Sequence, residues 1–394
     1  MENKNQENNA NQGFFIMIND ARKTQDNLRA CLNKGFYGFL MKNIYDLENT
    51  RQLMTPFSVL ADYACCKQGT HVFLFSKRTI TYGGVVAKNN GDSPVFYLNG
   101  PTNLFGNKID VERYVDLDNI YPNNLTDEEG IYEIEGRYGK QLKGIPFIIE
   151  FNNKTELSGK QIPVDELYFT LGKFNFPLPS NAIQGKGMCT LTPYETNTLL
   201  KLIYEKGKMI EPLKLTNPTA KIDHSKKTIF SNKLIIERFE NKKWSVEAEL
   251  EFLLLAIETK LNDILPEGKY VKTRQVPLCP FKPQNLDYAD ICLYDLENPI
   301  KEGSLPNIII ELKKDSADYN AYNQVNKYLR WLEQITTKSE FELINAYIIA
   351  KTFNSIDDRI LNKKGISLKY KDKIKFYSLN NNKFLKMDKQ QTLI

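Results

Sequence analysis

A run of three isoleucines that ends in two charged residues constrains the fold of this chain more than any other segment. Ile308–Ile310 are followed at once by Glu311, Leu312 and Lys313, within the segment Asn307–Lys314. A short apolar run of this kind is typical of a strand buried in a sheet. Burying a carboxylate and an ammonium group at its end costs free energy unless they pair or bind an ion. The segment therefore predicts a buried strand that leads into a polar site.

Helices and further strands are expected around this strand. A long helix is predicted from about Ser245 to Asp263 and a second one at Tyr319–Gln334, because apolar residues recur in both at three- and four-residue spacing. The expected stripe of the second helix consists of Tyr322, Val325, Leu329 and Leu332. Strands are predicted at Tyr270–Val276, Tyr288–Tyr294 and Phe341–Ala350. The order helix, three strands, helix, strand predicts an α/β sandwich with a mixed central sheet.

The first half of the chain has the pattern of an α+β domain with many strands. A hairpin is expected where Ser76-Lys77-Arg78 separates two apolar segments, His71–Phe75 and Thr79–Val86. Further strands are expected at Pro146–Phe151 and Leu167–Leu171. Helices are expected at Asp20–Lys34 and Thr192–Lys206, the second opening with the capping-box pair Thr192 and Glu195.

A chain of 394 residues is too long for one ordinary hydrophobic core, so two domains are expected. Residues 1–13 are rich in Asn, Gln and Glu and are expected to form a disordered lead-in. Residues 14–208 would form the first domain, and the polar, basic segment 209–243 would be a linker. Residues 244–394 would form the second domain.

Composition excludes several classes of protein. No apolar run approaches the roughly 20 residues of a membrane helix, and the N-terminus lacks the apolar segment of a signal peptide, so a cytoplasmic protein without a membrane partner is expected. An HNH nuclease or a Ser-His-Asp hydrolase would have to use His71 or His224, and neither lies in a supporting motif. The six cysteines contain no C-x-x-C pair and are expected to be buried thiols.

Two carboxylates on neighbouring strands could hold a magnesium ion. Alternate residues of a strand share a face, so Glu311 and Lys313 are expected to point the same way. Asp290 lies in the preceding apolar strand and would complete the carboxylate pair. Lys313 would lower the pKa of the attacking water and stabilise the pentavalent phosphorus. The triplet Glu-x-Lys alone is weak evidence, because it also occurs at Glu2–Lys4, Glu240–Lys242, Glu258–Lys260 and Glu267–Lys269.

Two further positions support the same site. Gln324 and Tyr328 are one turn apart on the second predicted helix and therefore share a face. Glu247 lies in the first turn of the long helix that precedes the sheet.

Taken in order, these motifs resemble the PD-(D/E)xK nuclease superfamily, most of all its RecB-like branch and the C-terminal domain of NucS-type endonucleases. The resemblance covers about Ser245–Leu332 and rests on four motifs: Glu247-x-x-Leu250, Asp290-Ile291, Ile310-Glu311-Leu312-Lys313 and Gln324-x-x-x-Tyr328. It implies a restriction-endonuclease-like fold that binds Mg²⁺, with Mn²⁺ able to substitute.

The resemblance also implies a role for each matched residue. Asp290 and Glu311 would be metal ligands and Lys313 catalytic, while Glu247 would lie near the metal. Gln324 and Tyr328 would orient DNA or the active site. The sequence departs from the family at one point, because Ala289 stands where a proline usually precedes the aspartate. Asp287 therefore stays an alternative to Asp290, and Glu249 and Glu251 stay alternatives to Glu247.

The first domain resembles the PUA-like barrels of the EVE and YTH families in a coarse pattern. The pattern consists of Phe14–Asn19 with the helix after it, the hairpin His71–Val86 and Pro146–Phe151. Such domains hold a flipped, modified base in an aromatic cage. The cage candidates here are Phe75, Tyr82, Phe174 and Phe176. The alternative is that these are core aromatics, and both tryptophans, which the families use in their cages, lie in the second half of this chain.

The expected function is that of a restriction-type or defence endonuclease. The first domain would select a DNA feature such as a modified base, and the second would hydrolyse the phosphodiester bond. One site per chain cuts one strand, so double-strand cleavage implies a homodimer. Two alternatives stay open: a NucS-like nuclease acting on mismatched or branched DNA, and an inactive nucleic-acid-binding module.

Overall fold

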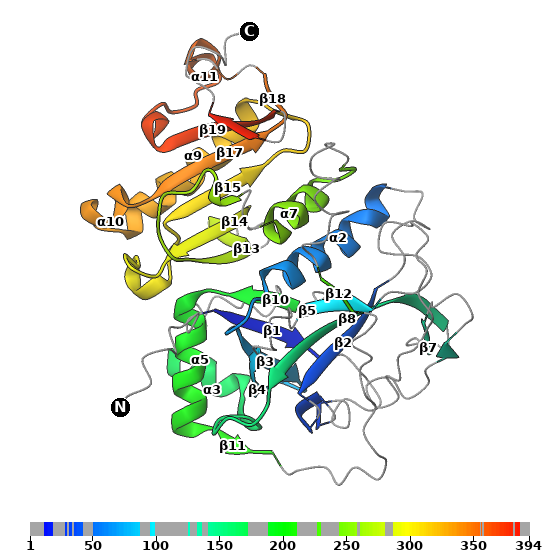
Figure 1. Ribbon diagram of the computed structural model, residues 1–394. Coiled ribbons are helices and arrows are strands. Elements are labelled where there is room, and N and C mark those ends of the chain that lie inside the picture. Colours follow the sequence, from blue (N-terminus) through cyan, green and yellow to red (C-terminus); the bar gives the residue numbers. More distant parts are fainter. Residues whose placement is uncertain are drawn as a thin grey trace. The chain divides into compact units, whose positions relative to one another are not determined.

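The computed structural model shows two compact units, residues Met1–Asn232 and Lys233–Ile394 (Figure 1). The boundary lies inside the segment 209–243 that was expected to be a linker. The structure describes residues 12–18, 28–29, 31–33, 35–41, 50–86, 95–98, 125–126, 132–135, 141–171, 188–210, 227–229, 244–257, 261–279, 287–354, 356, 358–380 and 383–386.

The first unit is built on a mixed sheet whose main path runs β10-β1-β3-β4-β8-β5-β12. The strands of this path are β10 (Met188–Leu191), β1 (Gly13–Met17), β3 (His71–Ser76), β4 (Thr79–Val86), β8 (Gln141–Asn152), β5 (Val95–Leu98) and β12 (Lys227–Ile229). The other strands are β2 (Phe36–Met41), β6 (Leu125–Thr126), β7 (Tyr132–Glu135), β9 (Lys160–Pro163) and β11 (Lys208–Met209). β1 begins at Gly13, the last residue of the expected lead-in, and β12 adds part of the expected linker to this sheet.

The predicted hairpin of β3 and β4 is confirmed. The two strands pair antiparallel from Ser76 and Thr79 onwards. Lys77 and Arg78, the two residues of the turn, have φ angles of 48° and 59°. Positive φ at both positions is what a two-residue hairpin turn requires, because it matches the twist of the strands.

The helices of the first unit are α2 (Thr50–Cys65), α3 (Val164–Leu171) and α5 (Pro193–Lys206). The predicted capping box of α5 is confirmed: Glu195 N donates to Thr192 Oγ1 at 3.2 Å, and Thr192 N donates to Glu195 Oε2 at 2.6 Å. The expected strand Leu167–Leu171 is wrong, since these residues belong to α3. A short apolar run does not by itself distinguish a strand from a helix. Most of the expected helix Asp20–Lys34 lies outside the described residues.

The second unit contains a mixed sheet in the order β13-β14-β15-β17-β19-β20. Its strands are β13 (Tyr270–Cys279), β14 (Asp287–Asp295), β15 (Ile308–Leu312), β17 (Asn345–Ala350), β19 (Ile374–Asn380) and β20 (Lys383–Lys386). β15 lies in the interior of the sheet, antiparallel to β14 and parallel to β17, and all five of its residues are buried. The predicted buried strand and the mixed sheet are therefore confirmed.

The remaining elements of the second unit are helices and one short strand pair. They are α7 (Glu247–Ala256), α9 (Tyr319–Ile335), α10 (Lys338–Glu342), α11 (Asp358–Lys363), the 3₁₀ turns η3 (Lys301–Gly303) and η4 (Lys371–Lys373), and the pair β16 (Ser316–Ala317) and β18 (Thr352–Phe353). Phe341 belongs to α10, so the expected strand Phe341–Ala350 begins only at Asn345. A capping box of Thr337 and Glu340 opens α10 and explains this difference.

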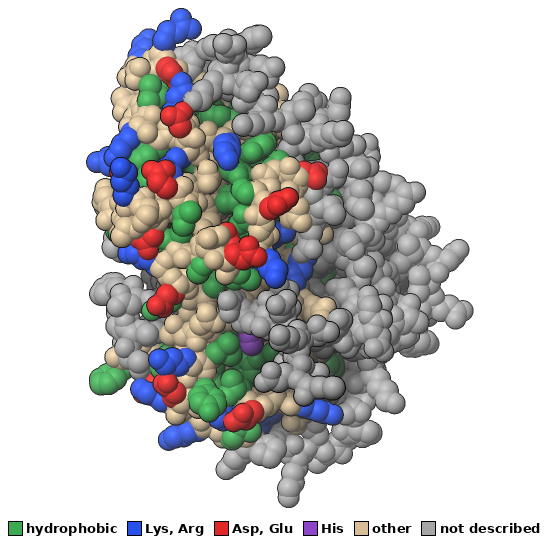
Figure 2. Space-filling model, turned by 60° about the vertical axis from the view of Figure 1, so that its left-hand side comes forward, with side chains coloured by type: hydrophobic (Ala, Val, Ile, Leu, Met, Phe, Trp, Pro, Cys, Tyr) green, Lys and Arg blue, Asp and Glu red, His purple; other side chains and the backbone are tan. Residues whose placement is uncertain are grey.

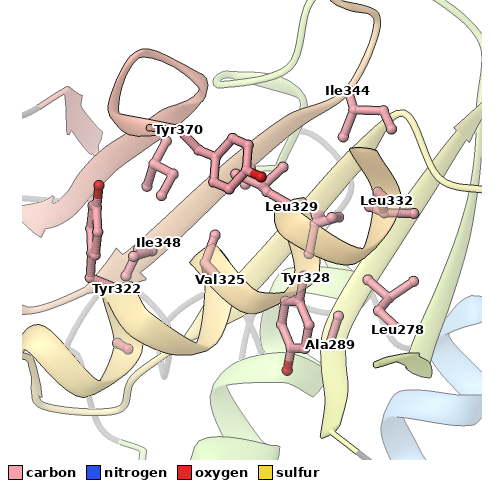
Figure 3. Packing of buried hydrophobic residues seen from close by; sticks show 14 of the residues in the cluster. Leu278, Ala289, Tyr322, Val325, Tyr328, Leu329, Leu332, Ile344, Ile348 and Tyr370 are labelled. Carbon is pink, nitrogen blue, oxygen red and sulfur yellow. The ribbon is translucent and has the colours of Figure 1, made fainter. Parts of the chain in front are cut away.

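Helix α9 buries its predicted stripe against the sheet. Tyr322, Val325, Leu329 and Leu332 are all buried in one cluster. Figure 3 shows side chains of this helix packed towards Ala289 of β14 and Ile348 of β17. The apolar period of three and four residues therefore gave α9 its core-facing side.

Helix α7 is shorter and more deeply buried than predicted. It ends at Ala256, because Ile257 has φ −101° and ψ 80°. All residues from Ala248 to Ala256 are buried, including Glu249 and Glu251, so the expected single apolar stripe is wrong. The two glutamates can be buried because each has a partner: Ser245 N donates to Glu249 Oε2, and Arg274 pairs with Glu251.

No helix in the described ranges is both long enough and apolar enough to cross a lipid bilayer.

Candidate active site

The register of two strands brings the predicted carboxylates together. β14 and β15 are antiparallel, with Cys292 opposite Ile309 and Ile291 opposite Ile310. Asp290 lies two residues before Cys292, and Glu311 lies two residues after Ile309. Because the strands are antiparallel, both residues are displaced in the same direction along the sheet. Because the side-chain period of a strand is two, both carboxylates lie on the face that carries Cys292 and Ile309.

The Asp290 carboxylate is buried and held by hydrogen bonds to both oxygens. The main-chain N–H of Leu312 donates to Oδ2 at 2.7 Å. The side-chain amide of Gln275, on β13, donates to Oδ1 at 3.3 Å. With 9% of the residue exposed, Asp290 has little access to water, so these donors replace most of its solvation.

The Glu311 carboxylate is still more buried, with 1% of the residue exposed. Lys313 Nζ donates to its Oε1 at 2.8 Å. Its other oxygen, Oε2, is buried and has no hydrogen-bond partner among the described residues. An unsatisfied carboxylate oxygen in a dry site is costly, and a bound cation is one way to satisfy it.

Lys313 is at the centre of the charged cluster. Besides Glu311, its ammonium group donates to Leu312 O at 2.8 Å and lies 3.5 Å from Glu247 Oε2. Burial lowers the pKa of Lys313, but Glu311, Glu247 and Asp290 outweigh this and raise the pKa above its usual value. The surrounding carboxylates therefore favour the protonated form of the lysine.

Three carboxyl groups, those of Glu311, Glu247 and Asp290, surround the single ammonium group of Lys313. Burial raises the pKa of Glu311 to about 7, against the opposing effect of Lys313. Burial also raises the pKa of Asp290 well above its usual value, and the nearby Glu311, Glu251 and Glu247 raise it further. A second cation between the two carboxylates would relieve both effects.

The donor set fits a hard divalent cation. Asp290 and Glu311 supply carboxylate oxygens, which Mg²⁺ prefers, and the unpartnered Oε2 of Glu311 is available to bind it. Within the described residues, no group of three or more His, Cys, Asp and Glu side chains is arranged to hold a metal. Mg²⁺ usually keeps several waters and is bound by one or two carboxylates plus substrate phosphate, so two protein ligands suit it.

Gln324 and Tyr328 brace the helix α9 against β14. Gln324 Nε2 donates to Tyr328 Oη at 2.7 Å, and Tyr328 Oη donates to Tyr288 O at 2.7 Å. Tyr288 is two residues before Asp290 on the same strand. Burial, and next the charge of Glu311, raise the pKa of the Tyr328 phenol, so it stays a donor. These contacts suit the predicted role of orienting the active site.

The alternative acidic residues have other partners. Asp287 lies at the start of β14 with its side chain 43% exposed, and its carboxylate is 3.9 Å from Lys327 Nζ. Glu249 accepts a hydrogen bond from Ser245 N, and Glu251 forms a buried ion pair with Arg274. Glu247 Oε2 lies 3.5 Å from Lys313 Nζ. The charge of Asp287 also acts on Glu311, and that of Glu251 acts on Asp290, so the metal-ligand roles of Asp290 and Glu311 and the role of Glu247 stay predictions.

Three residues of the site region were missed by sequence reasoning. Gln275 reaches Asp290, and Arg274 holds Glu251, both from β13. Trp244 Nε1 donates to Lys314 O at 2.8 Å and ties the start of α7 to the end of β15. No local pattern marks these residues, because each contact depends on which strand or helix lies next to it.

Two of the four cage candidates, Tyr82 and Phe75, pack into the core of the first unit. Tyr82 is 2% exposed, its hydroxyl is 2.8 Å from His71 Nδ1, and its ring meets Phe73 edge-on at 5.5 Å. Phe75 is partly buried in the same cluster and lies 5.4 Å from the ring of Phe15. This packing is that of core aromatics. Phe174 and Phe176 lie outside the described residues.

Charge on the visible surface is mixed. On the face in Figure 2, lysine and arginine side chains are interspersed with aspartate and glutamate over the described part of the surface. The formal net charge of +5 is therefore not gathered into one basic patch among the described residues of this face.

No protein-family model matches this chain, and no curated protein matches it. Among solved structures, a repair endonuclease from Pyrococcus abyssi matches 35% of this chain and 48% of its own, with 20% identity and a TM-score of 0.22. EndoMS in its apo form matches 32% of this chain and 45% of its own, with 19% identity and a TM-score of 0.20. A structure of an EndoMS–dsDNA2 complex matches 84% of this chain and 95% of its own, with 10% identity and a TM-score of 0.18. The matches to the first two span about half of those chains, and TM-scores this low establish no family.

Proposed function

We propose that the second unit is a metal-dependent endodeoxyribonuclease with the restriction-endonuclease-like α/β sandwich. The observation that carries the proposal is the buried pair of Asp290 and Glu311 beside Lys313, with one Glu311 oxygen left without a partner. A buried carboxylate oxygen without a partner costs stability, and titratable groups with perturbed pKa values concentrate at functional sites, so this cluster supports a catalytic use.

Each residue has a separate task in this proposal. Asp290 and Glu311 would hold Mg²⁺ or Mn²⁺. When bound, such a cation would stabilise negative charge on the phosphoryl oxygens and lower the pKa of water. Lys313, kept protonated by its carboxylate neighbours, would orient the attacking water and stabilise the charge that develops on the phosphate. Glu247, at 3.5 Å, would restrain the lysine ammonium group.

Hydrolysis conserves the atoms of water and the phosphodiester. The water oxygen forms a bond to phosphorus while the bond to the leaving oxygen breaks. The attacking water gives one proton to solvent, and the leaving oxygen takes up one proton from solvent to become a hydroxyl group. The carboxylates around Lys313 raise its pKa and favour the protonated form, so the contribution proposed for this residue is electrostatic.

The first unit would select the DNA. A restriction-type or defence enzyme needs such a selector, and a modified base is one feature it could read. Tyr82 would not contribute to a base cage, because it is buried and bonded to His71. With one site per chain, double-strand cleavage would require a homodimer.

The first prediction tests the cleavage site. With Mg²⁺ or Mn²⁺ present, the wild type should cut duplex DNA, and Glu311→Ala and Lys313→Ala should each slow cleavage about 100-fold or more, because each removes charge that acts on the reacting phosphate. The measurement is the rate of strand cleavage on a gel. Undiminished cleavage by both variants would overturn the assignment.

Matched controls come from a second Glu-x-Lys triplet. Glu267 and Lys269 have the same spacing but are exposed in the segment before β13. Glu267→Ala and Lys269→Ala should therefore cut at the wild-type rate. Methylated, unmodified, mismatched and branched substrates should be compared in the same assay: preference for mismatched or branched DNA would replace the restriction-type function, and binding without cleavage would indicate an inactive module.

A further inference from the structure

Gln275 has a backbone conformation that is unusual for a residue inside a strand. Its φ is 52°, although it lies in the middle of β13. The residues on either side keep their pairing, Arg274 with Ile291 and Val276 with Ala289. A left-handed conformation is unfavourable for any residue with a Cβ, and such residues persist where the surroundings hold them. Contacts with neighbouring residues therefore have to hold Gln275 in this conformation.

The neighbouring residue anchors the strand at this point. Arg274 donates to Glu251 through Nε at 2.9 Å and through Nη2 at 2.6 Å. Both side chains are 3% exposed, so this bidentate pair is shielded from water and competing ions. The strand is thus fixed to α7 immediately before the residue with positive φ.

The unchanged register places Gln275 directly across from Asp290. Because Arg274 pairs with Ile291 and Val276 with Ala289, the residue between them faces the residue between those partners. The contact is made by the side chain: Gln275 Nε2 donates to Asp290 Oδ1 at 3.3 Å.

The Asp290 carboxylate is oriented by two donors of different kinds. Leu312 N holds Oδ2 and belongs to the backbone of β15, while Gln275 is a side chain. The Nε2 amide group, which faces Asp290, cannot bind a cation, so through this contact Gln275 acts on the Asp290 carboxylate. Groups that hydrogen-bond a metal ligand fix its orientation and strongly affect metal affinity.

We propose that Gln275 is a positioning residue for the metal site, which orients the Asp290 carboxylate so that it can share a divalent cation with Glu311. This inference rests on the proposed function, since it assigns Gln275 a role towards the cation of that same site. The strained backbone is maintained because it directs the side-chain amide at Asp290.

The test measures binding of Mn²⁺ alone to the full chain by calorimetry, together with the melting temperature. Gln275→Gly removes both the amide and the strain. It should weaken Mn²⁺ affinity about 10-fold or more, while its melting temperature is no lower than that of the wild type. A residue with a merely structural role would show the reverse, a lower melting temperature with unchanged affinity.

A matched control removes the same backbone strain away from the site. Glu302 lies in η3 with a φ of 58°, so Glu302→Gly should keep the wild-type Mn²⁺ affinity. Gln275→Asn is a second site variant that tolerates a positive φ but shortens the amide by one methylene group, and it too should bind Mn²⁺ more weakly.

The outcomes separate the inference from the proposed function. If the wild type binds Mn²⁺ and both Gln275 variants bind it equally well, the inference is overturned and the proposed function stands. If the wild type binds no Mn²⁺, both are overturned. Weaker binding by both variants, with normal binding by Glu302→Gly, supports the inference.

Discussion

At the scale of single residues, the second unit is distinguished by charged side chains that are buried in its interior. Glu311, Asp290, Glu251 and Arg274 are all nearly inaccessible to water. Arg274 and Glu251 satisfy each other, whereas Glu311 keeps one oxygen without a partner in the described structure. Because Arg274 and Glu251 neutralise each other, we interpret their pair as structural. The Oε2 atom of Glu311 has no such partner in the described structure and is available for a ligand.

Arg274→Ala should destabilise the second unit by about 3–5 kcal/mol, because it leaves Glu251 buried and unpaired. The double variant Arg274→Met/Glu251→Leu should be much closer to the wild type, since no charge is left buried. The measurement is urea unfolding followed by tryptophan fluorescence, which reports on this unit because Trp244 and Trp331 both lie in it. Equal destabilisation by the single and the double variant would show that the pair has no such role.

At the scale of elements, capping boxes define two helix starts in different surroundings. In α5 the box of Thr192 and Glu195 is buried, and burial raises the pKa of Glu195 to about 7. In α10 the box of Thr337 and Glu340 is exposed, and the hydrogen bond from the Thr337 backbone lowers the pKa of Glu340. The same motif therefore responds to pH in opposite directions.

The stability of the first unit should fall as the pH rises from about 4.5 to about 7, because the folded state holds the Glu195 proton more tightly than the unfolded state. Glu195→Gln should remove the contribution of this residue to the slope of unfolding free energy against pH. Hydrogen exchange of the α5 amides measures it without interference from the other unit. An unchanged slope in Glu195→Gln would contradict the prediction.

The control for this experiment is Glu340→Gln in α10. Because the pKa of Glu340 is lowered, its contribution to stability is present above its ordinary pKa and is lost as the pH falls. The variant should leave the slope of the α5 amides between about pH 4.5 and 7 unchanged.

At the scale of the whole molecule, the two units each have their own sheet and core. The strand β12, within the segment expected to link the domains, pairs with β5 of the first unit. The boundary at Asn232 and Lys233 therefore divides neither of the two sheets formed by the described strands.

A fragment of residues Lys233–Ile394 should consequently fold alone and unfold in one cooperative step. Its tryptophan fluorescence should give the same urea midpoint as that of the full chain, within experimental error. If it also carries the proposed metal site, it should bind Mn²⁺ with the full chain's affinity. A fragment with no cooperative transition would show that the first unit is needed for folding.

Local sequence patterns were sufficient to predict the elements that have a strong apolar period or a capping box. The Ile308–Leu312 strand, the buried stripe of α9 and the capping box of α5 follow from side-chain spacing and hydrogen bonds between close neighbours. The sequence also indicated Asp290, Glu311 and Lys313 as one site, because the side-chain period of two on neighbouring strands limits which faces can meet.

The remaining contacts and one helix depend on how segments distant in sequence pack against each other. Gln275 reaches Asp290 because β13 pairs with β14 in one register, and a shift of one residue would turn the amide to the other face. Glu251 can be buried because Arg274, 23 residues away, lies against α7. Likewise α3 is a helix although its apolar run also suits a strand. These contacts depend on residues that are distant in sequence, so a local sequence pattern does not predict their interaction energies.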